Sequence, residues 1–229
     1  MKIALDGPAG SGKGTICSRV ADQLNLINFS SGEVYRLATY LLVSPEYSKE
    51  ITNPIQIIEL ITSGRVAYKW NQITKSSEVW LDGNDIKPDL HKQTISTKVA
   101  EISKTFTREI TETAEFIVNT IHDDLICEGR NVATHIIPNA NIKIYLDASP
   151  EIRTRRRMQD IINQGDSIEF DTLLAQIKER DRLDMTRDYA PLVRLPEAIY
   201  VDTSQQTIDQ SVQQIVDIIE GASVVTENR

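Results

Sequence analysis

The stretch ALDGPAGSGKGT, residues 4–15, constrains the fold of this chain more than any other. Residues 2–6 form a short apolar run that predicts a buried strand, and apolar residues recur at helical spacing from Lys13 to Leu24. A glycine-rich loop between a strand and a helix directs backbone N–H groups and the positive end of the helix dipole toward one point, where an anion binds. The order strand, loop, helix therefore predicts a phosphate site and makes a mere glycine-rich turn a much weaker interpretation.

One position in this loop departs from the usual pattern, which is G-x-x-x-x-G-K followed by a serine or threonine that holds Mg²⁺. Gly7, Gly12 and Lys13 match, but Gly14 stands where the hydroxyl belongs and Thr15 comes one residue later. We expect Lys13 to contact the β- and γ-phosphates and Thr15 to reach the α-phosphate. Mg²⁺ would then be held by phosphate oxygens and water, because it gives up its hydration shell reluctantly.

Two carboxylates end neighbouring predicted strands and could accept hydrogen bonds from metal-bound water. These are Asp6 and Glu128. A strand-end carboxylate can equally well fix the local backbone, so the sequence leaves both roles open for each residue.

Strands and helices alternate along most of the chain. The predicted strands cover residues 2–6, 26–29, 124–130, 141–149 and 198–204, and the predicted helices cover 13–24, 32–42, 150–163, 170–188 and about 207–220. This alternation predicts an open parallel sheet that binds ligands at the carboxyl ends of its strands. Residues 50–123 differ, since the segments RVAYKWNQI and SEVWLDG predict a β-hairpin, in which we interpret Trp70 and Trp80 as packing residues.

The charge balance limits the class of ligand. With 25 basic and 33 acidic residues, the net charge of −8 argues against a large nucleic-acid surface but not against small phosphorylated ligands.

The two cysteines, Cys17 and Cys127, have no metal-site spacing and fit ordinary buried residues in a reducing compartment. No apolar run is long enough to span a bilayer, so we expect a cytoplasmic protein that binds no membrane.

The arginines are unevenly distributed. Of 14 in the chain, seven fall between Arg153 and Arg187. The run EIRTRRRMQ brings Arg153 and Arg157 one helical turn apart, and such a cluster repels itself unless an anion neutralises it. A helix of this kind could close over ATP as a lid that excludes water, although a solvated basic helix is the simpler interpretation.

A second arginine group lies in KERDRLDMTRDYAPL. Arg180, Asp184 and Arg187 share one helical face, as a salt-bridged surface stripe or as part of a site. Arg36 and Arg130 each follow a predicted strand and would lie along the ligand edge of the sheet. An acceptor that is itself a phosphate would need such residues.

Six ordered blocks together resemble the bacterial cytidylate kinases, a branch of the nucleoside monophosphate kinase family. The blocks are DGPAGSGKGT, SSGEVYR, CEGRNVAT, IPNANIKIYLDASPEIRTRRR, IKERDRLDMTRDYAPL and AIYVDTS. The G-K-G-T ending occurs in this family, so Gly14 is not a defect. The resemblance implies a P-loop α/β fold of three layers with a five-stranded parallel sheet in the order 2-3-1-4-5. It implies a single P-loop kinase domain over residues 1–229, with a hairpin-containing acceptor-binding insert at about 44–122 and a helical lid at about 153–168.

The resemblance also assigns roles residue by residue. The ATP-binding residues would be Gly7, Pro8, Ala9, Gly10, Ser11, Gly12, Lys13, Gly14 and Thr15. The acceptor-binding residues would be Ser31, Arg36, Arg108, Arg130, Asn131, Arg180, Asp184 and Arg187. The catalytic charges would be Lys13, Arg130, Arg187, Arg157 and Arg153, and Mg²⁺ with ATP would have no direct protein ligand.

Three departures from the family pattern bear on the choice of acceptor base. The family usually reads D-G-R-D-I-G-T where this chain has EGRNVAT, so Asn131 replaces an aspartate expected near the cytosine amino group. A carboxylate only accepts hydrogen bonds, whereas an amide can donate or accept. Ala100 stands where a base-contacting serine is expected, and His91 where an arginine is common. The resemblance therefore leaves the base selectivity open.

The implied reaction is transfer of the γ-phosphoryl group of ATP to CMP or dCMP. No surplus apolar face is evident in the sequence, so we expect a monomer. An acceptor phosphate is already an oxyanion and needs no general base, so we expect no catalytic role for His91, His122 or His135. The alternatives are a kinase with a relaxed or shifted preference, chiefly for UMP, and a P-loop ATP-binding regulatory protein. A GTPase would need an N-K-x-D stretch, and a kinase for an uncharged metabolite would need fewer acceptor-side arginines.

Overall fold

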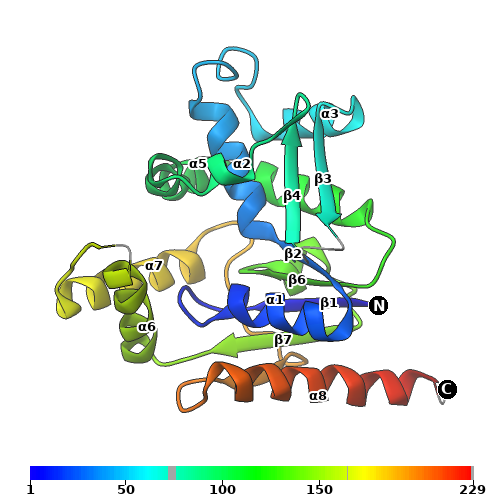
Figure 1. Ribbon diagram of the computed structural model, residues 1–229, viewed down its shortest axis with the longest axis vertical. Helices are drawn as coiled ribbons and strands as arrows, with labels where there is room; N and C mark the ends of the chain where they lie inside the picture. Colours follow the sequence, from blue (N-terminus) through cyan, green and yellow to red (C-terminus); the bar gives the residue numbers. More distant parts are fainter. Residues whose placement is uncertain (72–75, 164, 228–229) are drawn as a thin grey trace.

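A five-stranded parallel sheet forms the centre of the molecule, in the order β2-β6-β1-β7-β8. The computed structural model describes residues 1–71, 76–163 and 165–227, with side chains up to Ala222. The strands are β1 (Lys2–Asp6), β2 (Ile27–Ser30), β6 (Leu125–Gly129), β7 (Ile142–Asp147) and β8 (Ile199–Asp202). Counted along the sheet strands alone, this is the predicted order 2-3-1-4-5 (Figure 1).

Helices cover both faces of the sheet, which confirms the three layers. Helices α1 (Lys13–Leu24) and α8 (Ile208–Glu227) pack on one face, and α2 (Ser31–Val43) and α5 (Gln93–Asn119) on the other (Figure 1). Each face has its own apolar core, because the central strands are buried on both sides. Helix α8 continues to Glu227, beyond the predicted end near residue 220.

The central position of β1 fixes where a ligand would bind. Its apolar residues pair in parallel with β6 on one side and β7 on the other, and Asp6 lies in register with Gly129 and Tyr145. The carboxyl ends of these strands therefore meet at one edge. The loop to α1 and the start of α2 lie at the same edge, where parallel sheets bind ligands.

The insert contains the predicted hairpin and more. It comprises a short 3-10 helix (Pro54–Gln56), α3 (Ile57–Thr62), β3 (Val66–Asn71), β4 (Ser76–Leu81), β5 (Asn84–Asp85) and α4 (Lys87–Leu90), followed by α5. The short third strand β5 was not predicted, and most of the predicted hairpin turn lies outside the described residues.

The two tryptophans interpreted as packing residues lie outside the apolar cores. Trp70 and Trp80 are only partly buried and neither belongs to an apolar core cluster. The ring of Trp80 instead lies 4.8 Å from the Lys69 ammonium nitrogen, and its Nε1 donates to Glu78 at 2.9 Å. Alternation along β4 explains this, because Trp80 lies between Val79 and Leu81, which are turned into the core.

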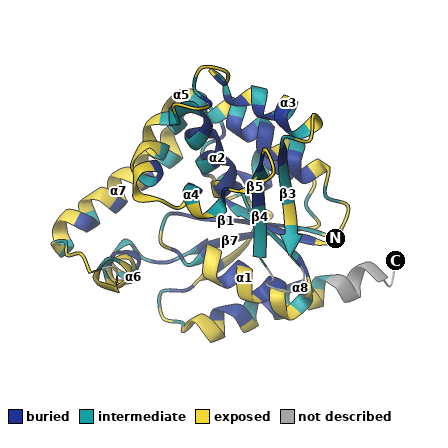
Figure 2. Cartoon of the chain, turned by 45° about the horizontal axis from the view of Figure 1, so that its top comes forward, coloured by how far each residue is buried: buried dark blue, intermediate teal, exposed yellow. Residues whose placement is uncertain are grey.

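Two helices project from the ligand edge. They are α6 (Pro150–Asn163) and α7 (Phe170–Thr186), which pack mainly on each other and are largely exposed (Figure 2). The proposed lid range falls on α6 and the loop after it. A π-helix, Val132–Ile136, follows β6 at the same edge. In the described part of the chain, no helix combines the length and apolar character needed to cross a membrane.

Candidate active site

The phosphate loop closes tightly between β1 and α1. A Cβ on Gly7 would lie 2.0 Å from the backbone oxygen of Leu146, so only glycine fits against β7 there. Gly12 caps α1 with a φ of 93°, in the left-handed region that glycine adopts without strain. By contrast, a Cβ on Gly14 would meet nothing within 4 Å. The side of the loop where the usual hydroxyl would stand is therefore open.

Lys13 turns back onto its own loop. Its Nζ donates to the backbone oxygens of Gly7 at 2.8 Å and Pro8 at 2.7 Å, and to the Ser11 hydroxyl at 3.3 Å. The side chain is buried, and desolvation, with a smaller contribution from the charge of Arg130, lowers its pKa to about 7. The lysine is thus positioned by neutral acceptors that phosphate oxygens could replace.

Asp6 has a structural role. Its two carboxylate oxygens accept the backbone N–H groups of Val132 and Ala133, each at 2.8 Å, at the start of the π-helix. The residue is 2% exposed, and burial raises its pKa against the opposing effect of these hydrogen bonds. Of the two roles left open for Asp6, the geometry supports fixing the backbone rather than holding metal-bound water. The segment that carries Arg130 and Asn131 is fastened to β1 by this contact.

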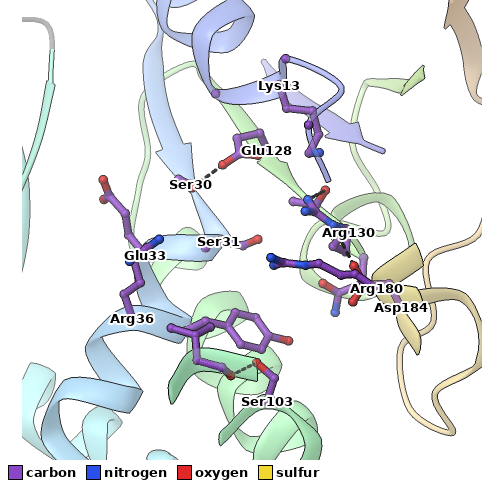
Figure 3. A pocket seen from close by; sticks show the side chains of 18 of the residues that line it. Lys13, Ser30, Ser31, Glu33, Arg36, Ser103, Glu128, Arg130, Arg180 and Asp184 are labelled. Atoms are coloured by element: carbon purple, nitrogen blue, oxygen red, sulfur yellow. Dashed lines mark hydrogen bonds and ion pairs between the residues drawn. The ribbon is translucent and has the colours of Figure 1, made fainter. Parts of the chain in front are cut away.

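Glu128 differs, since it lines the cavity described below and accepts a hydrogen bond from Ser30 Oγ (Figure 3). Among the described residues no group of three carboxylate, histidine or cysteine side chains could hold a metal ion. A single carboxylate with a neighbouring hydroxyl suits Mg²⁺ that keeps most of its water and binds through ATP phosphates. The residues present fit such a hydrated ion, and Glu128 and Ser30 are the groups that would contact its hydration shell.

One cavity of about 580 Å³ connects the phosphate loop with the arginines predicted to bind the acceptor, and its two ends are named here the donor end and the acceptor end after these predictions. Gly12, Lys13 and Thr15 line one end, and Ser31, Arg36, Arg130, Asn131, Arg180, Asp184 and Arg187 line the other. In Figure 3, Arg130 and Arg180 extend into the cavity from one wall, with Asp184 beside them. Side chains from four regions that are distant in the sequence thus share one space.

The acceptor end carries more positive than negative charge. Arg130 pairs with Asp184 at 3.1 Å, and Arg36 donates to the backbone oxygen of Leu90 and to Ser96. Arg180 makes no hydrogen bond or ion pair with any other described residue. Desolvation, followed by the charge of Arg130, lowers its pKa. An anion would relieve this repulsion.

Arg187 points to the same conclusion. Its Nε donates to the backbone oxygen of Ala190, but its Nη2 is buried without a hydrogen-bond partner in the described structure. A buried guanidinium nitrogen left unpaired is costly, and a ligand oxygen would satisfy it. Desolvation is the main cause of the lowered pKa of Arg36 and Arg180, and the charge of exposed Arg157 on α6 adds to it. Arg157 therefore lies within electrostatic reach of this end.

The role predicted for Arg153 is corrected. It is 3% exposed, its Nε donates to the backbone oxygen of Ala148, its Nη1 to that of Ala9, and its Nη2 to Asp181 at 2.6 Å. Its position in the first turn of α6 places it beneath the phosphate loop, where it joins α6 and α7. It is therefore a structural residue, not a mobile lid arginine.

Arg156, to which the sequence assigned no role, is a candidate for holding the phosphate loop in place. Its guanidinium donates to the backbone oxygens of Ser11 and Thr203 and to the Thr203 hydroxyl, so it supports the phosphate loop from the outside. The sequence could not distinguish Arg156 from the neighbouring arginines of the run. Adjacent helical positions point in different directions, and periodicity alone does not show which of them meets the phosphate loop.

Two residues of α5 that the family resemblance places near the acceptor base, Ala100 and Arg108, lie outside this cavity. Ser103, one helical turn after Ala100, lines the cavity, whereas Ala100 lines a neighbouring space of about 830 Å³ between α5 and α7. Arg108 also lies in that second space and stacks on the Tyr189 ring at 4.3 Å. A kink at Phe106 in α5 separates the two parts of this helix. The structure thus brings Arg108 together with Arg180, Asp184 and Arg187 around the second space, but not with Ser31, Arg36, Arg130 and Asn131 in the first cavity.

Comparison with known proteins gives consistent matches over almost the whole chain. The family model described as cytidylate kinase matches residues 3–221. A cytidylate kinase of Alkaliphilus oremlandii is 34% identical over 96% of this chain and 98% of its own length. A cytidylate kinase of Aquifex aeolicus is 32% identical over 99% of both chains. The crystal structure of an uncharacterized protein from Eubacterium ventriosum aligns with a TM-score of 0.53 at 12% identity, over 96% of this chain and 98% of that one, and shows likeness of fold alone.

Proposed function

The chain belongs to the cytidylate kinase family, and from this premise we propose that it transfers the γ-phosphoryl group of ATP to CMP or dCMP, giving ADP and the corresponding diphosphate. One observation carries the proposal for this site. A single cavity has a phosphate loop at one end and a cluster of incompletely paired arginines at the other. Such a cavity suits two anionic ligands that meet end to end.

The donor end would bind ATP through residues 7–15. Backbone N–H groups at the start of α1 would face the phosphates, and Lys13 would exchange its contacts with Gly7 and Pro8 for phosphate oxygens. Mg²⁺ bound with ATP would supply charge neutralisation between the phosphates. Glu128 and Ser30 would orient the water around it.

The acceptor end would bind the monophosphate through Arg36, Arg130 and Arg187, with Arg180 and Asp184 near its sugar. The acceptor oxygen is already anionic, so catalysis needs alignment and charge stabilisation rather than a general base. Arg157 would approach the transferred group when α6 moves toward the cavity, and exclusion of water would favour transfer over hydrolysis. Asn131, Ser31 and Ser103 would face the base or its surroundings.

The main alternative is a shifted base preference, because Asn131 is an amide where the family has a carboxylate. The test is ADP release from Mg·ATP with each of CMP, dCMP, UMP, AMP and GMP. We expect CMP and dCMP to give the highest kcat/KM. UMP as the best acceptor would overturn the cytidine assignment, and Asn131→Asp should then move the preference toward CMP.

A regulatory ATP-binding protein or ATPase is the second alternative, and the same assay separates it. ADP release that does not depend on an acceptor would support it. Against it stands the positive acceptor end of the cavity, which an ATPase has no use for.

Three further expectations remain proposals. We propose that the enzyme is a cytoplasmic monomer whose partners are nucleotides rather than nucleic acid, in keeping with a net charge of −8. Sedimentation at micromolar concentration checks the monomer, and the salt dependence of any DNA or RNA binding checks the ligand class.

A further inference from the structure

Behind the acceptor end of the cavity, three polar side chains form a hydrogen-bonded chain that leads into the core. Asn131 Nδ2 donates to Thr111 Oγ1 at 3.0 Å, and Thr111 Oγ1 lies 3.3 Å from the Tyr35 hydroxyl. Asn131 and Thr111 are each 1% exposed. Asn131 and Tyr35 line the cavity, whereas Thr111 lies behind them on α5. The reaction as proposed does not use Thr111.

The orientation of the Asn131 amide decides what this residue can recognise. Its oxygen accepts hydrogen bonds and its nitrogen donates them. Cytosine presents an amino donor at the position where a uracil-type base presents a carbonyl acceptor. An asparagine that rotated freely would serve either base, whereas one held with its oxygen toward the cavity would favour cytosine.

Two features hold the amide in one orientation. The nitrogen is engaged by Thr111, which leaves Oδ1 as the atom available to the cavity that Asn131 lines. Arg130, Arg180 and Arg187 line the same cavity, and their positive charge attracts the oxygen end of the amide dipole. A hydroxyl oxygen accepts two hydrogen bonds, so Thr111 can take the amide N–H and the Tyr35 O–H together.

We propose that Thr111 is a positioning residue that holds the Asn131 amide with Oδ1 toward the acceptor base, so that this kinase selects cytosine with an amide. The proposal rests on the proposed function, since it requires a pyrimidine in this cavity. It makes Asn131, Thr111 and Tyr35 one specificity unit rather than three separate residues.

The test compares kcat/KM for CMP and UMP in the wild-type enzyme, Thr111→Val and Thr111→Ser. Valine removes the acceptor at nearly constant volume, so the CMP:UMP ratio should fall roughly tenfold, as for loss of one buried hydrogen bond. Serine keeps the hydroxyl and should restore the wild-type ratio. If Thr111→Val does not fold, Thr111→Cys replaces the hydroxyl with a much weaker acceptor and makes the same comparison.

An Asn131→Asp background distinguishes positioning from general packing. Both carboxylate oxygens accept, so orientation no longer matters, and adding Thr111→Val should change the CMP:UMP ratio less than about twofold. An equal fall of the ratio in both backgrounds, or no fall in the wild-type background, would overturn the proposal.

The outcomes for the two proposals are separable. A wild-type protein that phosphorylates no monophosphate would refute the proposed function. A wild-type protein that prefers UMP would be a kinase whose amide is not held as proposed. A wild-type preference for CMP that Thr111→Val leaves unchanged would refute the positioning role alone.

Discussion

The two ends of the cavity differ in how their charged groups are satisfied. At the donor end, Lys13 donates to three neutral oxygens within its own loop and Asp6 accepts two backbone N–H groups. At the acceptor end, Arg180 has no hydrogen bond among the described residues and Arg187 has a buried nitrogen without one. The polar groups of the donor end therefore satisfy one another, whereas the acceptor end leaves arginine groups that an anionic ligand could pair with.

The donor end therefore depends mainly on backbone geometry, and the acceptor end depends mainly on the charge of its arginines. The phosphate loop keeps its geometry through glycines and backbone contacts, so a lost side chain there should affect chemistry more than folding. The arginines repel one another, so the acceptor end should gain stability from any anion that fits. Each prediction below tests one side of this contrast, from the largest expected effect to the smallest.

Removing the donor-end charge should have the largest effect. Lys13→Ala should lower kcat by about 10³-fold or more, because the charge acts on the phosphates in the transition state. The thermal midpoint should change little, since only hydrogen bonds to loop oxygens are lost. Lys143→Ala is the control. It removes a lysine of β7 that pairs with Glu197, and it should retain normal kcat. Near-normal turnover in Lys13→Ala would contradict the assignment.

At the acceptor end, two arginines of α7 form a matched pair. Arg180→Ala should lower kcat/KM for CMP by about 10²-fold or more while leaving KM for ATP nearly unchanged, since Arg180 faces the cavity. Arg182→Ala removes an exposed arginine paired with Glu179 and should stay within about twofold of the wild type. Similar losses in both variants would mean that the charge of the helix, rather than its cavity face, matters.

Arg153 tests the corrected role at the base of α6. Arg153→Ala breaks a buried pair with Asp181 and two bonds to backbone oxygens, so it should destabilise the protein by about 3 kcal/mol in urea unfolding. Arg155→Ala, which removes an exposed arginine over the Phe170 ring, should cost less than about 1 kcal/mol. Unchanged stability in Arg153→Ala with loss of activity would restore the original lid assignment.

The lowered pKa of Lys13, about 7, predicts a dependence on pH. An unfolded chain keeps the proton on this lysine up to its ordinary pKa, so between the two values the unfolded state binds more protons and the stability of the ligand-free protein rises with pH. ATP should raise the pKa again, and its binding near pH 8 should take up close to one proton. Calorimetry in HEPES and Tris measures this uptake, which Lys13→Ala should abolish.

The smallest expected effect is a gain in stability at Gly14. A Cβ there meets nothing within 4 Å, so Gly14→Ala should stabilise α1 by about 0.5–1 kcal/mol. Gly10→Ala should destabilise, because Gly10 has a φ of 77° and a Cβ would lie 3.2 Å from that of Arg153. Destabilisation by both substitutions would show that the loop is less open at Gly14 than its geometry indicates.

Much of the fold followed from the sequence because its signals are local. The apolar runs, the glycines of the phosphate loop and the helical spacing after Lys13 each act within a few residues, and they predicted the sheet strands and the hairpin. The strand order came from the family resemblance. Most of the residues predicted to bind the acceptor line one cavity, and each had been singled out because it followed a strand or repeated on a helical face.

The remaining features depend on packing between distant segments. Nothing near Arg153 indicates that Asp181 and Ala9 will enclose it, and nothing near Asp6 indicates that both oxygens will meet the π-helix after β6. The partnership of Thr111 with Asn131 joins α5 to the end of β6 across 20 residues of sequence. The kink at Phe106 likewise altered which residues of α5 share the cavity, which spacing along an ideal helix could not show.

Direct analysis of the products tests the central claim most plainly. Purified protein is incubated with Mg·ATP and CMP, and the nucleotides and phosphate are followed together by ³¹P NMR. The account predicts CDP and ADP in equal amounts, no inorganic phosphate, and a rate at least about 10³-fold lower in Lys13→Ala. ADP accompanied by inorganic phosphate instead of CDP would contradict it.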